Sequence, residues 1–207
     1  MPRSSEQNER LRAERRDRIL RAARLRFAAN GLTATRIADI AAAAGMAQGL
    51  LYHYFPTKED LFAAVVADAF DRLRAATDGL EALSWAPAKK IASALAALVH
   101  SLATDDAFAP TILLIAQASL SDATPEPTRA LMRRERDHPY AAMARIFAAG
   151  QRDGSVPPGD PADLAVAFWA LIKGLALHKA AWGPDFRPPD LATLGRPFLT
   201  SPAPAGP

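Results

Sequence analysis

The chain has no cysteine, and this absence excludes disulfide bridges and thiolate metal sites. Its four histidines form no metal-spaced pair with a carboxylate, so we expect no metal site and no cofactor. No apolar run approaches the roughly 18 residues of a membrane span, and residues 1–18 lack the apolar stretch of a secretory signal. These absences predict a cytoplasmic protein with no membrane partner.

Aromatic residues are scarce, at 7% of the 207 residues, although half of the residues are apolar. Helical periodicity runs through nearly the whole sequence, and no segment shows the alternation of a strand. The length is sufficient to bury a substantial core. The pattern therefore predicts an all-α protein with three small helices, a connecting helix and a larger bundle.

Acidic residues are few near the N-terminus. Residues 1–58 contain 11 Lys/Arg and 5 Asp/Glu, a balance of +6, whereas residues 59–207 contain 14 and 17, a balance of −3. A basic module on a neutral or acidic body predicts binding to a polyanion. A solvated arginine-rich helix without a partner is the alternative that charge alone leaves open.

Helix boundaries are expected at turn and cap residues. Asn30-Gly31 is a typical helix end, Thr35 is a plausible N-cap, and Pro87 is a typical first-turn residue. A bend is expected near His138-Pro139, and a loose proline-rich tail after Gly183. The predicted helices span about residues 10–30, 36–44, 48–55, 57–77, 87–102, 110–120, 128–151, 160–182 and 190–194.

The segment from Ile37 to Phe55 has the plan of a helix-turn-helix motif, with Gly45 at the turn. In such a motif the second helix lies in the major groove of DNA. Leu51 and Phe55 are four residues apart and are expected to anchor this helix, so Tyr52, His53 and Tyr54 would project toward DNA. Periodicity alone leaves a second interpretation, in which both tyrosines rim the core of a plain helical hairpin.

The stretch TRIADIAAAAGMAQGLLYHYFPTKEDLF resembles the signature of the TetR family of bacterial transcription regulators, and ILRAARLRFAANGL is similar to the family's first helix. The signature matches at Thr35, Ile40, Ala41, Ala44, Gly45, Gly49, Leu51, Tyr52, Phe55, Lys58 and Leu61. The resemblance implies a DNA-binding domain over residues 13–73, with the motif at 36–55. It also implies a regulatory, ligand-binding and dimerisation domain over residues 80–199.

The resemblance implies DNA contacts at Thr35, Arg36, Gln48, Gly49, Tyr52, His53, Tyr54 and Lys58. We expect Gln48 and His53 to reach base edges, whereas Thr35, Tyr52, Tyr54 and Lys58 would contact phosphates, and Arg36 suits either role. The chain departs from the family pattern at Ala47, where a capping Ser is usual, and at Leu50, where Thr is frequent. Losing the cap costs about 1 kcal/mol of helix stability, and Leu50 can instead touch a thymine methyl.

The resemblance further implies a homodimeric repressor that leaves a palindromic double-stranded operator when a small apolar or amphipathic effector binds. The expected interface is Ala162–Trp182, with part of residues 128–151, because the last helix is weak. Candidate pocket residues are His100, Phe108, Gln117, Tyr140, Phe147, Trp169, Lys173 and His178. For each of them, ordinary packing is the alternative.

Two other functions remain open at this point. One is an activator, or a regulator controlled by a partner, of the same fold but without a small ligand. The other, from a different class, is an enzyme built on an α-bundle. It is remote, because no G-x-S-x-G, P-loop, H-E-x-x-H or inward Glu-x-x-His repeat is present. We therefore expect that the protein is not an enzyme.

Overall fold

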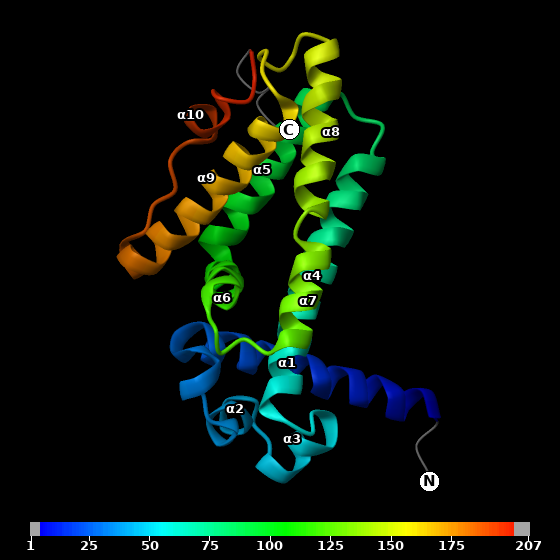
Figure 1. Ribbon diagram of the computed structural model, residues 1–207, viewed down its shortest axis with the longest axis vertical. Coiled ribbons are helices and arrows are strands. Elements are labelled where there is room, and N and C mark those ends of the chain that lie inside the picture. The colour runs from blue at the N-terminus through cyan, green and yellow to red at the C-terminus, as the bar shows by residue number, and fades with distance from the viewer. Residues whose placement is uncertain (1–4, 201–207) are drawn as a thin grey trace. The chain divides into compact units, whose positions relative to one another are not determined.

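The computed structural model describes residues 5–200, which fold almost entirely into helices (Figure 1). No strand occurs among these residues, so the prediction of an all-α fold is confirmed. The helices are α1 (Ser5–Ala34), α2 (Ile37–Ala43), α3 (Gln48–Tyr54), α4 (Lys58–Ala82), α5 (Pro87–Thr104), α6 (Phe108–Leu120), α7 (Glu126–Glu135), α8 (His138–Arg152), α9 (Pro161–Trp182) and α10 (Leu191–Gly195), with a 3-10 turn at Gly183–Asp185.

The chain divides into two compact units. The N-terminal unit contains the chain up to Ala69 together with Leu113–Met132, and the C-terminal unit contains Phe70–Ile112 and the chain from Arg133 onward. The sequence assigned all of residues 80–199 to one domain. The second half of α6 and most of α7 instead pack with the N-terminal unit.

The core of the N-terminal unit is built around α1. Phe27 of α1 is fully buried and meets Phe62 of α4 edge-to-face, with ring centroids 5.1 Å apart. Arg24, on the same helix, donates to the Asp68 carboxylate at 2.6 Å, and only 9% of its side chain is exposed. Because a buried guanidinium is costly unless paired, this ion pair fixes α4 against α1.

Helix α1 begins earlier than the sequence predicted, at Ser5 rather than near residue 10. An exposed ion pair one turn apart, Arg10–Glu14 at 3.0 Å, supports the helix next to this added segment. The expected break at Gly31 is confirmed, because its φ of 70° and ψ of 177° leave the helical region. A residue without Cβ tolerates this conformation.

The last turn of α4 was predicted to be a loop, and this prediction was wrong, because the helix continues through Gly79 to Ala82. Two contacts hold this turn. Lys90 Nζ donates to the Glu81 carbonyl at 2.6 Å, and Arg145 donates to both carboxylate oxygens of Glu81 at 2.6 and 2.8 Å. Long-range contacts of this kind override the weak helix propensity of glycine.

The single bent helix predicted over residues 128–151 is in fact two helices, α7 and α8. The break follows from Pro139 in the first turn of α8, since proline lacks the amide hydrogen and clashes with the preceding helical turn. The indole nitrogen of Trp169 donates to the Pro139 carbonyl at 3.1 Å and holds the start of α8 against α9.

An aromatic cluster forms the centre of the C-terminal unit. The Phe168 ring of α9 lies 6.2 Å from that of Phe147 and 5.6 Å from that of Phe198. The prediction of a loose tail was therefore wrong up to residue 200, since Phe198 is buried and Thr200 N donates to the Ser155 carbonyl at 3.1 Å. Apolar side chains fasten this segment despite its prolines. Residues 201–207 lie outside the described range.

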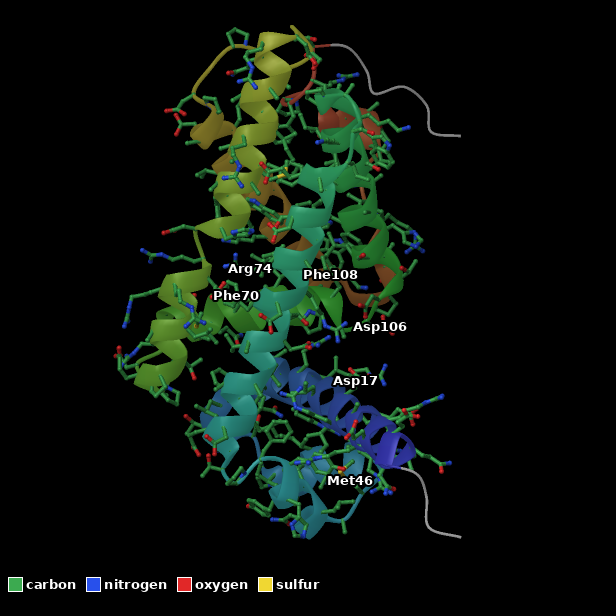
Figure 2. The ribbon with its side chains drawn as sticks, turned by 90° about the vertical axis from the view of Figure 1, so that its right-hand side faces the viewer. Asp17, Met46, Phe70, Arg74, Asp106 and Phe108 are labelled. Atoms are coloured by element: carbon green, nitrogen blue, oxygen red, sulfur yellow. The ribbon has the colours of Figure 1, made fainter. Side chains whose placement is uncertain are left out.

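Polar side chains connect the C-terminal half of α4 to the end of α7 and the start of α8. Arg74, one turn after Phe70 on α4 (Figure 2), donates to the Glu135 carboxylate and lies 3.0 Å from His138 Nδ1. The other ring nitrogen of His138 lies 2.6 Å from the Asp78 carboxylate. The hydrogen bond from Arg74 lowers the pKa of Glu135 below its usual value.

Acidic pH should weaken the contact between Arg74 and Glu135. Because the folded-state pKa of Glu135 is depressed, its contribution to stability is complete above the ordinary glutamate value, near 4.5, and is lost as pH falls through the folded pKa. We expect Glu135→Gln to lower the melting temperature at pH 7 and to have a shrinking effect below about pH 4.5. A pH-independent difference between the two proteins would contradict this.

The N-cap of α9 is Asp160, whose carboxylate accepts from the Ala162 amide at 2.8 Å. The segment Pro161–Asp185 is long and apolar enough to cross a bilayer by length and composition. The sequence did not predict this, because the apolar residues of the segment do not form one uninterrupted run. The core helix of a water-soluble protein meets the same criterion. Phe168 and Ile172 on α9 are buried in the bundle core.

A glycine in α8 marks a tight approach within the C-terminal unit. A Cβ at Gly150 would lie 2.4 Å from Val156 Cγ2 and 3.2 Å from its Cβ. We expect Gly150→Ala to lower the free energy of unfolding by about 1–3 kcal/mol through overpacking. Adding Val156→Ala should recover part of that loss in thermal or urea unfolding.

Gly79→Ala is the matched control, because that helical glycine has no atom within 4 Å of the added Cβ. It should raise stability by about 1 kcal/mol, the difference in helix propensity between the two residues. Equal destabilisation by the two substitutions would contradict the assignment of a steric contact at Gly150.

Candidate nucleic-acid interface

Helix α3 has one buried side and one exposed side. Leu51 is completely buried, and Phe55, the residue that caps the helix, is 5% exposed. The two residues anchor α3, as their four-residue spacing predicted. The remaining positions form its outer surface: Leu50 and Tyr54 are half-buried, and the exposed positions are Gln48, Gly49, Tyr52 and His53.

The turn between α2 and α3 gives the pair its helix-turn-helix geometry. Gly45 has a φ of 65°, the left-handed conformation expected at this position. Its amide donates to the Ala42 carbonyl at 3.1 Å, and Met46 N donates to the Ala41 carbonyl at 3.0 Å. These bonds satisfy the last carbonyls of α2 and direct the chain into α3.

The first turn of α3 has no side-chain cap. Ala47 occupies the N-cap position, and its methyl group accepts no hydrogen bond. Three consecutive positions at this end, Ala47, Gln48 and Gly49, are exposed. The free amides of a helix N-terminus attract phosphate oxygens, so an uncapped start leaves them available to an anionic ligand.

Thr35 is buried rather than exposed. Only 2% of it is accessible, and its hydroxyl lies within donating distance of the carbonyls of Gly31 (2.6 Å) and Arg26 (3.1 Å). The N-cap of α2 is Arg36, not Thr35 as the sequence suggested. Burial favours a positioning role for Thr35 over a side-chain contact with phosphate.

Lys58 joins the start of α4 to the segment that enters α2. Its ammonium donates to the Thr33 carbonyl at 3.0 Å and to the Thr35 carbonyl at 3.1 Å. An ammonium has three donors, so one N–H remains. Beside it, Thr57 caps α4, since Asp60 N donates to the Thr57 hydroxyl at 3.0 Å and that hydroxyl donates to the Asp60 carboxylate at 2.7 Å.

Arg36 is an exposed cation of the motif, with 79% of its side chain accessible. It makes a two-pronged contact with Asp39, at 3.0 and 3.1 Å, and these hydrogen bonds lower the pKa of the Asp39 carboxyl. Exposed pairs of this kind are weak. A phosphate can therefore replace Asp39 as the partner of Arg36 at little cost.

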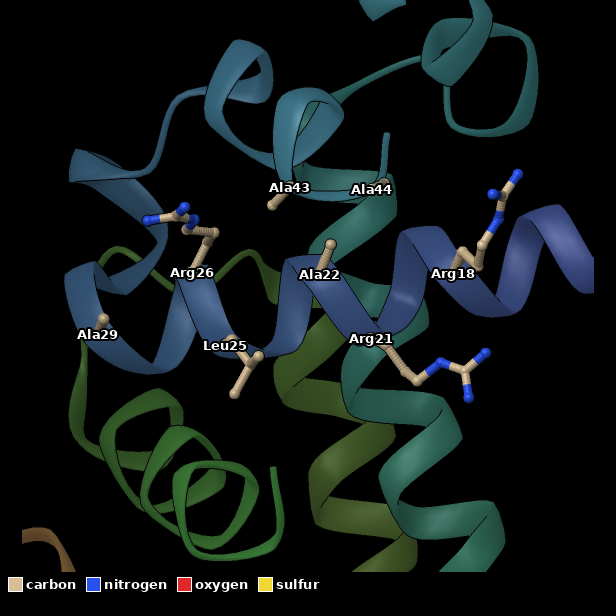
Figure 3. A pocket seen from close by; sticks show the side chains of 8 residues that line it. All are labelled: Arg18, Arg21, Ala22, Leu25, Arg26, Ala29, Ala43 and Ala44. Carbon is tan, nitrogen blue, oxygen red and sulfur yellow. The ribbon is translucent and has the colours of Figure 1, made fainter. Parts of the chain in front are cut away.

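Beside the motif, a hollow of about 540 Å³ lies between α1 and the C-terminal end of α2 (Figure 3). Ala22 faces Ala43 and Ala44 across it, and arginines stand at its rim. The hollow is lined by Arg18, Arg21, Ala22, Leu25, Arg26, Ala29, Ala43 and Ala44. The three arginines that line it give this part of the N-terminal unit a positive charge.

None of the eight predicted pocket residues lines the hollow beside α1. Phe147 and Trp169 are buried in the aromatic core, and Phe108 is half-buried. His100 and Gln117 are exposed. A second hollow, of about 360 Å³, contains none of the eight and is lined by Glu81, Pro87, Lys90, Arg145, Ile146, Ala148, Ala149 and Arg152.

Three of the eight meet each other. Lys173 Nζ donates to the Tyr140 hydroxyl at 2.7 Å and also lies over the Tyr140 ring, and that ring is 6.2 Å from the Trp169 ring. His178 instead stacks on Trp182, with centroids 4.1 Å apart. The structure thus brings Tyr140, Trp169 and Lys173 together, as three neighbouring members of the predicted set.

The sequence missed one contact at the interface. The guanidinium carbon of Arg16, in α1, lies 5.5 Å from the centroid of the Phe55 ring. Arg16 precedes the buried Leu20 by four residues, and therefore shares the side of α1 that faces the motif. That spacing was a signal from which the contact was predictable.

Two protein-family models match the chain, one over its N-terminal part and one over its C-terminal part. Residues 19–65 match the model of bacterial regulatory proteins of the tetR family, and residues 87–201 match that of the C-terminal domain of BetI-type transcriptional repressors. The HTH-type transcriptional repressor KstR2 of Mycolicibacterium smegmatis is 46% identical over 61 residues. That alignment spans only 30% of the length of each of the two proteins.

Solved structures extend the likeness to most of the chain. A TetR-family regulator from Agrobacterium tumefaciens has a TM-score of 0.70 at 24% identity, with 89% of this chain and 93% of that chain covered. A protein from Saccharomonospora viridis, described as a transcriptional regulator in complex with choline, has a TM-score of 0.61 at 26% identity. That likeness covers 83% of this chain and 88% of the other.

Proposed function

Because the chain belongs to the TetR family of bacterial transcription regulators, we propose that it acts as a homodimeric repressor on a palindromic operator and is released by a small apolar or amphipathic ligand. The outer surface of α3 supports this most directly. It presents an amide, a hydroxyl and an imidazole on a helix that Leu51 and Phe55 anchor from behind. Such a regulator works in the cytoplasm, where its operator lies.

The proposed contacts divide between bases and phosphates. Gln48 is exposed at the start of α3, where recognition helices reach base edges, and His53 is exposed in its last turn. Tyr52 and Tyr54 have hydroxyls suited to phosphate oxygens, and Lys58 has its third N–H. Arg36 serves either partner, the bare backbone of Gly49 allows close approach, and Thr35 acts through its position.

Tyr52→Ala should weaken binding to every duplex by about fivefold, because a phosphate hydrogen bond contributes about 1 kcal/mol regardless of sequence.

Gln48→Ala should relax preference at one base position of each half-site, where a good contact discriminates by about 1–3 kcal/mol. Both variants are measured by fluorescence anisotropy with matched and mismatched duplexes. Equal effects of Gln48→Ala on all sequences would contradict base reading at that residue.

The proposed homodimer uses the exposed side of α9. Val166 and Leu177 are 55% and 62% exposed, and small residues, Ala170 and Gly174, lie between them on the same face. Apolar patches of this kind on a helix are typical of interfaces. A twofold dimer would present two copies of α3 to half-sites about 34–36 Å apart.

Release by ligand is proposed as a shift between two arrangements of the DNA-reading helices. Moving such an equilibrium from 99:1 to 1:99 takes about 10⁴-fold stronger binding to the released state. Burial of an apolar ligand can supply this free energy. The eight residues from His100 to His178 remain the proposed contacts.

Choline is the first probe, since the Saccharomonospora viridis relative was solved with it. A ligand that prefers the released state should raise the melting temperature and weaken binding to the operator in proportion. A rise in melting temperature with no change in operator affinity would contradict release by that ligand.

A further inference from the structure

The arginines of α1 differ in their partners. Those that form ion pairs do so with Glu14, Asp17 and Asp68. Arg12 and Arg16 are exposed and form no ion pair in the described part of the chain. Two unpaired cations one turn apart therefore occupy the N-terminal part of this helix.

Both side chains leave α1 on the side that packs against the motif. Leu20, Ala23 and Phe27 are buried and repeat at three- and four-residue steps along α1. Arg16 and Arg12 continue this row in steps of four, so they lie on the same side of the helix. The row therefore consists of buried apolar residues from Leu20 onward. Before Leu20, where α1 extends beyond the core, it consists of the exposed Arg16 and Arg12.

The contact with Phe55 fixes where this row lies relative to α3. Arg16 lies 5.5 Å from the centre of the Phe55 ring, and Phe55 caps the C-terminal end of α3. Where a recognition helix lies in the major groove, its ends are bordered by the sugar-phosphate backbone. Arg16 is thus held at the edge of the surface that would face DNA.

We propose that Arg12 and Arg16 bind phosphates of the duplex just outside the segment that α3 reads, a proposal that rests on the proposed function. Four residues of helix separate the two by about 6 Å along the axis. Phosphates of one strand recur about every 3.4 Å of duplex length. The two guanidiniums are therefore spaced for phosphates about two steps apart, and they add flanking length to the site without reading its sequence.

The stretch of unpaired positive charge is short. Glu9 lies on the same side of α1, one turn before Arg12, and is exposed. A carboxylate there repels phosphate, which limits the proposed contact to two phosphates per half-site. On this account the N-terminal arm of α1 sets how much flanking duplex the protein covers.

The test uses the full-length protein and two duplexes. The operator sequence is first obtained by selection of bound duplexes from a random pool. One test duplex carries this operator with several flanking base pairs at each end, and the other stops at the last base pair of each half-site. Removing the flanks should weaken binding by wild type and leave an Arg12→Ala/Arg16→Ala variant unchanged. On the long duplex, the slope of log K against log salt should be less steep by about 3.6 in the variant, at about 0.9 per phosphate and two phosphates in each of the two half-sites.

The slope difference gives a measurable fold-change. Between 50 and 200 mM salt, wild type should lose about 150-fold more affinity than the double variant. Arg21→Ala is the matched control, since Arg21 points away from Ala43 and Ala44 of α2 (Figure 3) and pairs with Asp17. It should keep the flank dependence and the salt slope of wild type. All the variants should keep the wild-type melting temperature within a few degrees, because their substitutions are exposed.

The possible failures are distinguishable. Wild type that binds both duplexes equally would overturn the flanking contact while leaving the proposed function intact. A flank effect that changes with flank sequence would overturn the assignment to phosphates in favour of base reading. Wild type that binds no duplex would overturn the proposed function and this inference with it.

Discussion

Leu177→Asp should turn the proposed dimer into a monomer and weaken operator binding by at least about a hundredfold. In a twofold interface the substitution places two carboxylates on facing apolar surfaces, where each is desolvated without a partner. A monomer binds one half-site only, and linking two binding modules commonly raises affinity by about 10²–10⁴. Sedimentation and anisotropy measure the two effects.

Leu120→Asp is the matched control, because Leu120 is even more exposed, at 88%, but lies at the end of α6. It should leave both the mass and the operator affinity unchanged. A Leu177→Asp protein that sediments as a dimer would place the interface elsewhere than on the exposed side of α9.

Leu51→Ala should have the largest effect on the DNA-binding unit. Leu51 is completely buried behind α3, and truncating a buried leucine costs about 2.7–5 kcal/mol through lost burial and the cavity left behind. Because α3 is only seven residues long, its position depends on this anchor more than on its own helix propensity. Duplex binding should fall with the stability of the unit.

The neighbouring leucine provides the comparison. Leu50 is half-buried and on the outer side of α3, so Leu50→Ala should change the free energy of unfolding by less than about 1 kcal/mol. It should still alter duplex preference if its side chain meets a thymine methyl. Equal losses of stability in urea unfolding of the two variants would contradict the assigned orientation of α3.

Periodicity and capping residues were sufficient to predict most of the helices. Leu51 and Phe55 were assigned to the inner side of α3 from their spacing alone, and their burial agrees. Gly45 was placed in the turn because only a residue without Cβ adopts a positive φ there cheaply. These features are local, and local sequence determines them.

The errors involve contacts between residues distant in the chain. Arg145 and Lys90 hold the last turn of α4 through Glu81, and no pattern near Gly79 indicates this. Phe198 fastens a proline-rich tail by joining a cluster that forms only after folding. Tertiary packing of this kind overrides local propensity.

The candidate site was predictable in its positions but not in its chemistry. The resemblance placed Thr35 and Lys58 at the interface, whereas the structure shows that both hold the backbone before α2 together. A hydroxyl or an ammonium in a sequence does not reveal whether a carbonyl of the same chain already binds it. The side of α1 from which Arg16 contacts Phe55 was predictable, because Arg16 lies four residues before the buried Leu20.

Selection of bound duplexes from a random pool tests the central claim most directly, because it requires the outer surface of α3 to read a DNA groove. We predict enrichment of one twofold-symmetric sequence with half-sites about 34–36 Å apart, bound with an affinity that falls steeply as salt rises. A pool that stays random after repeated rounds in dilute buffer would contradict the claim.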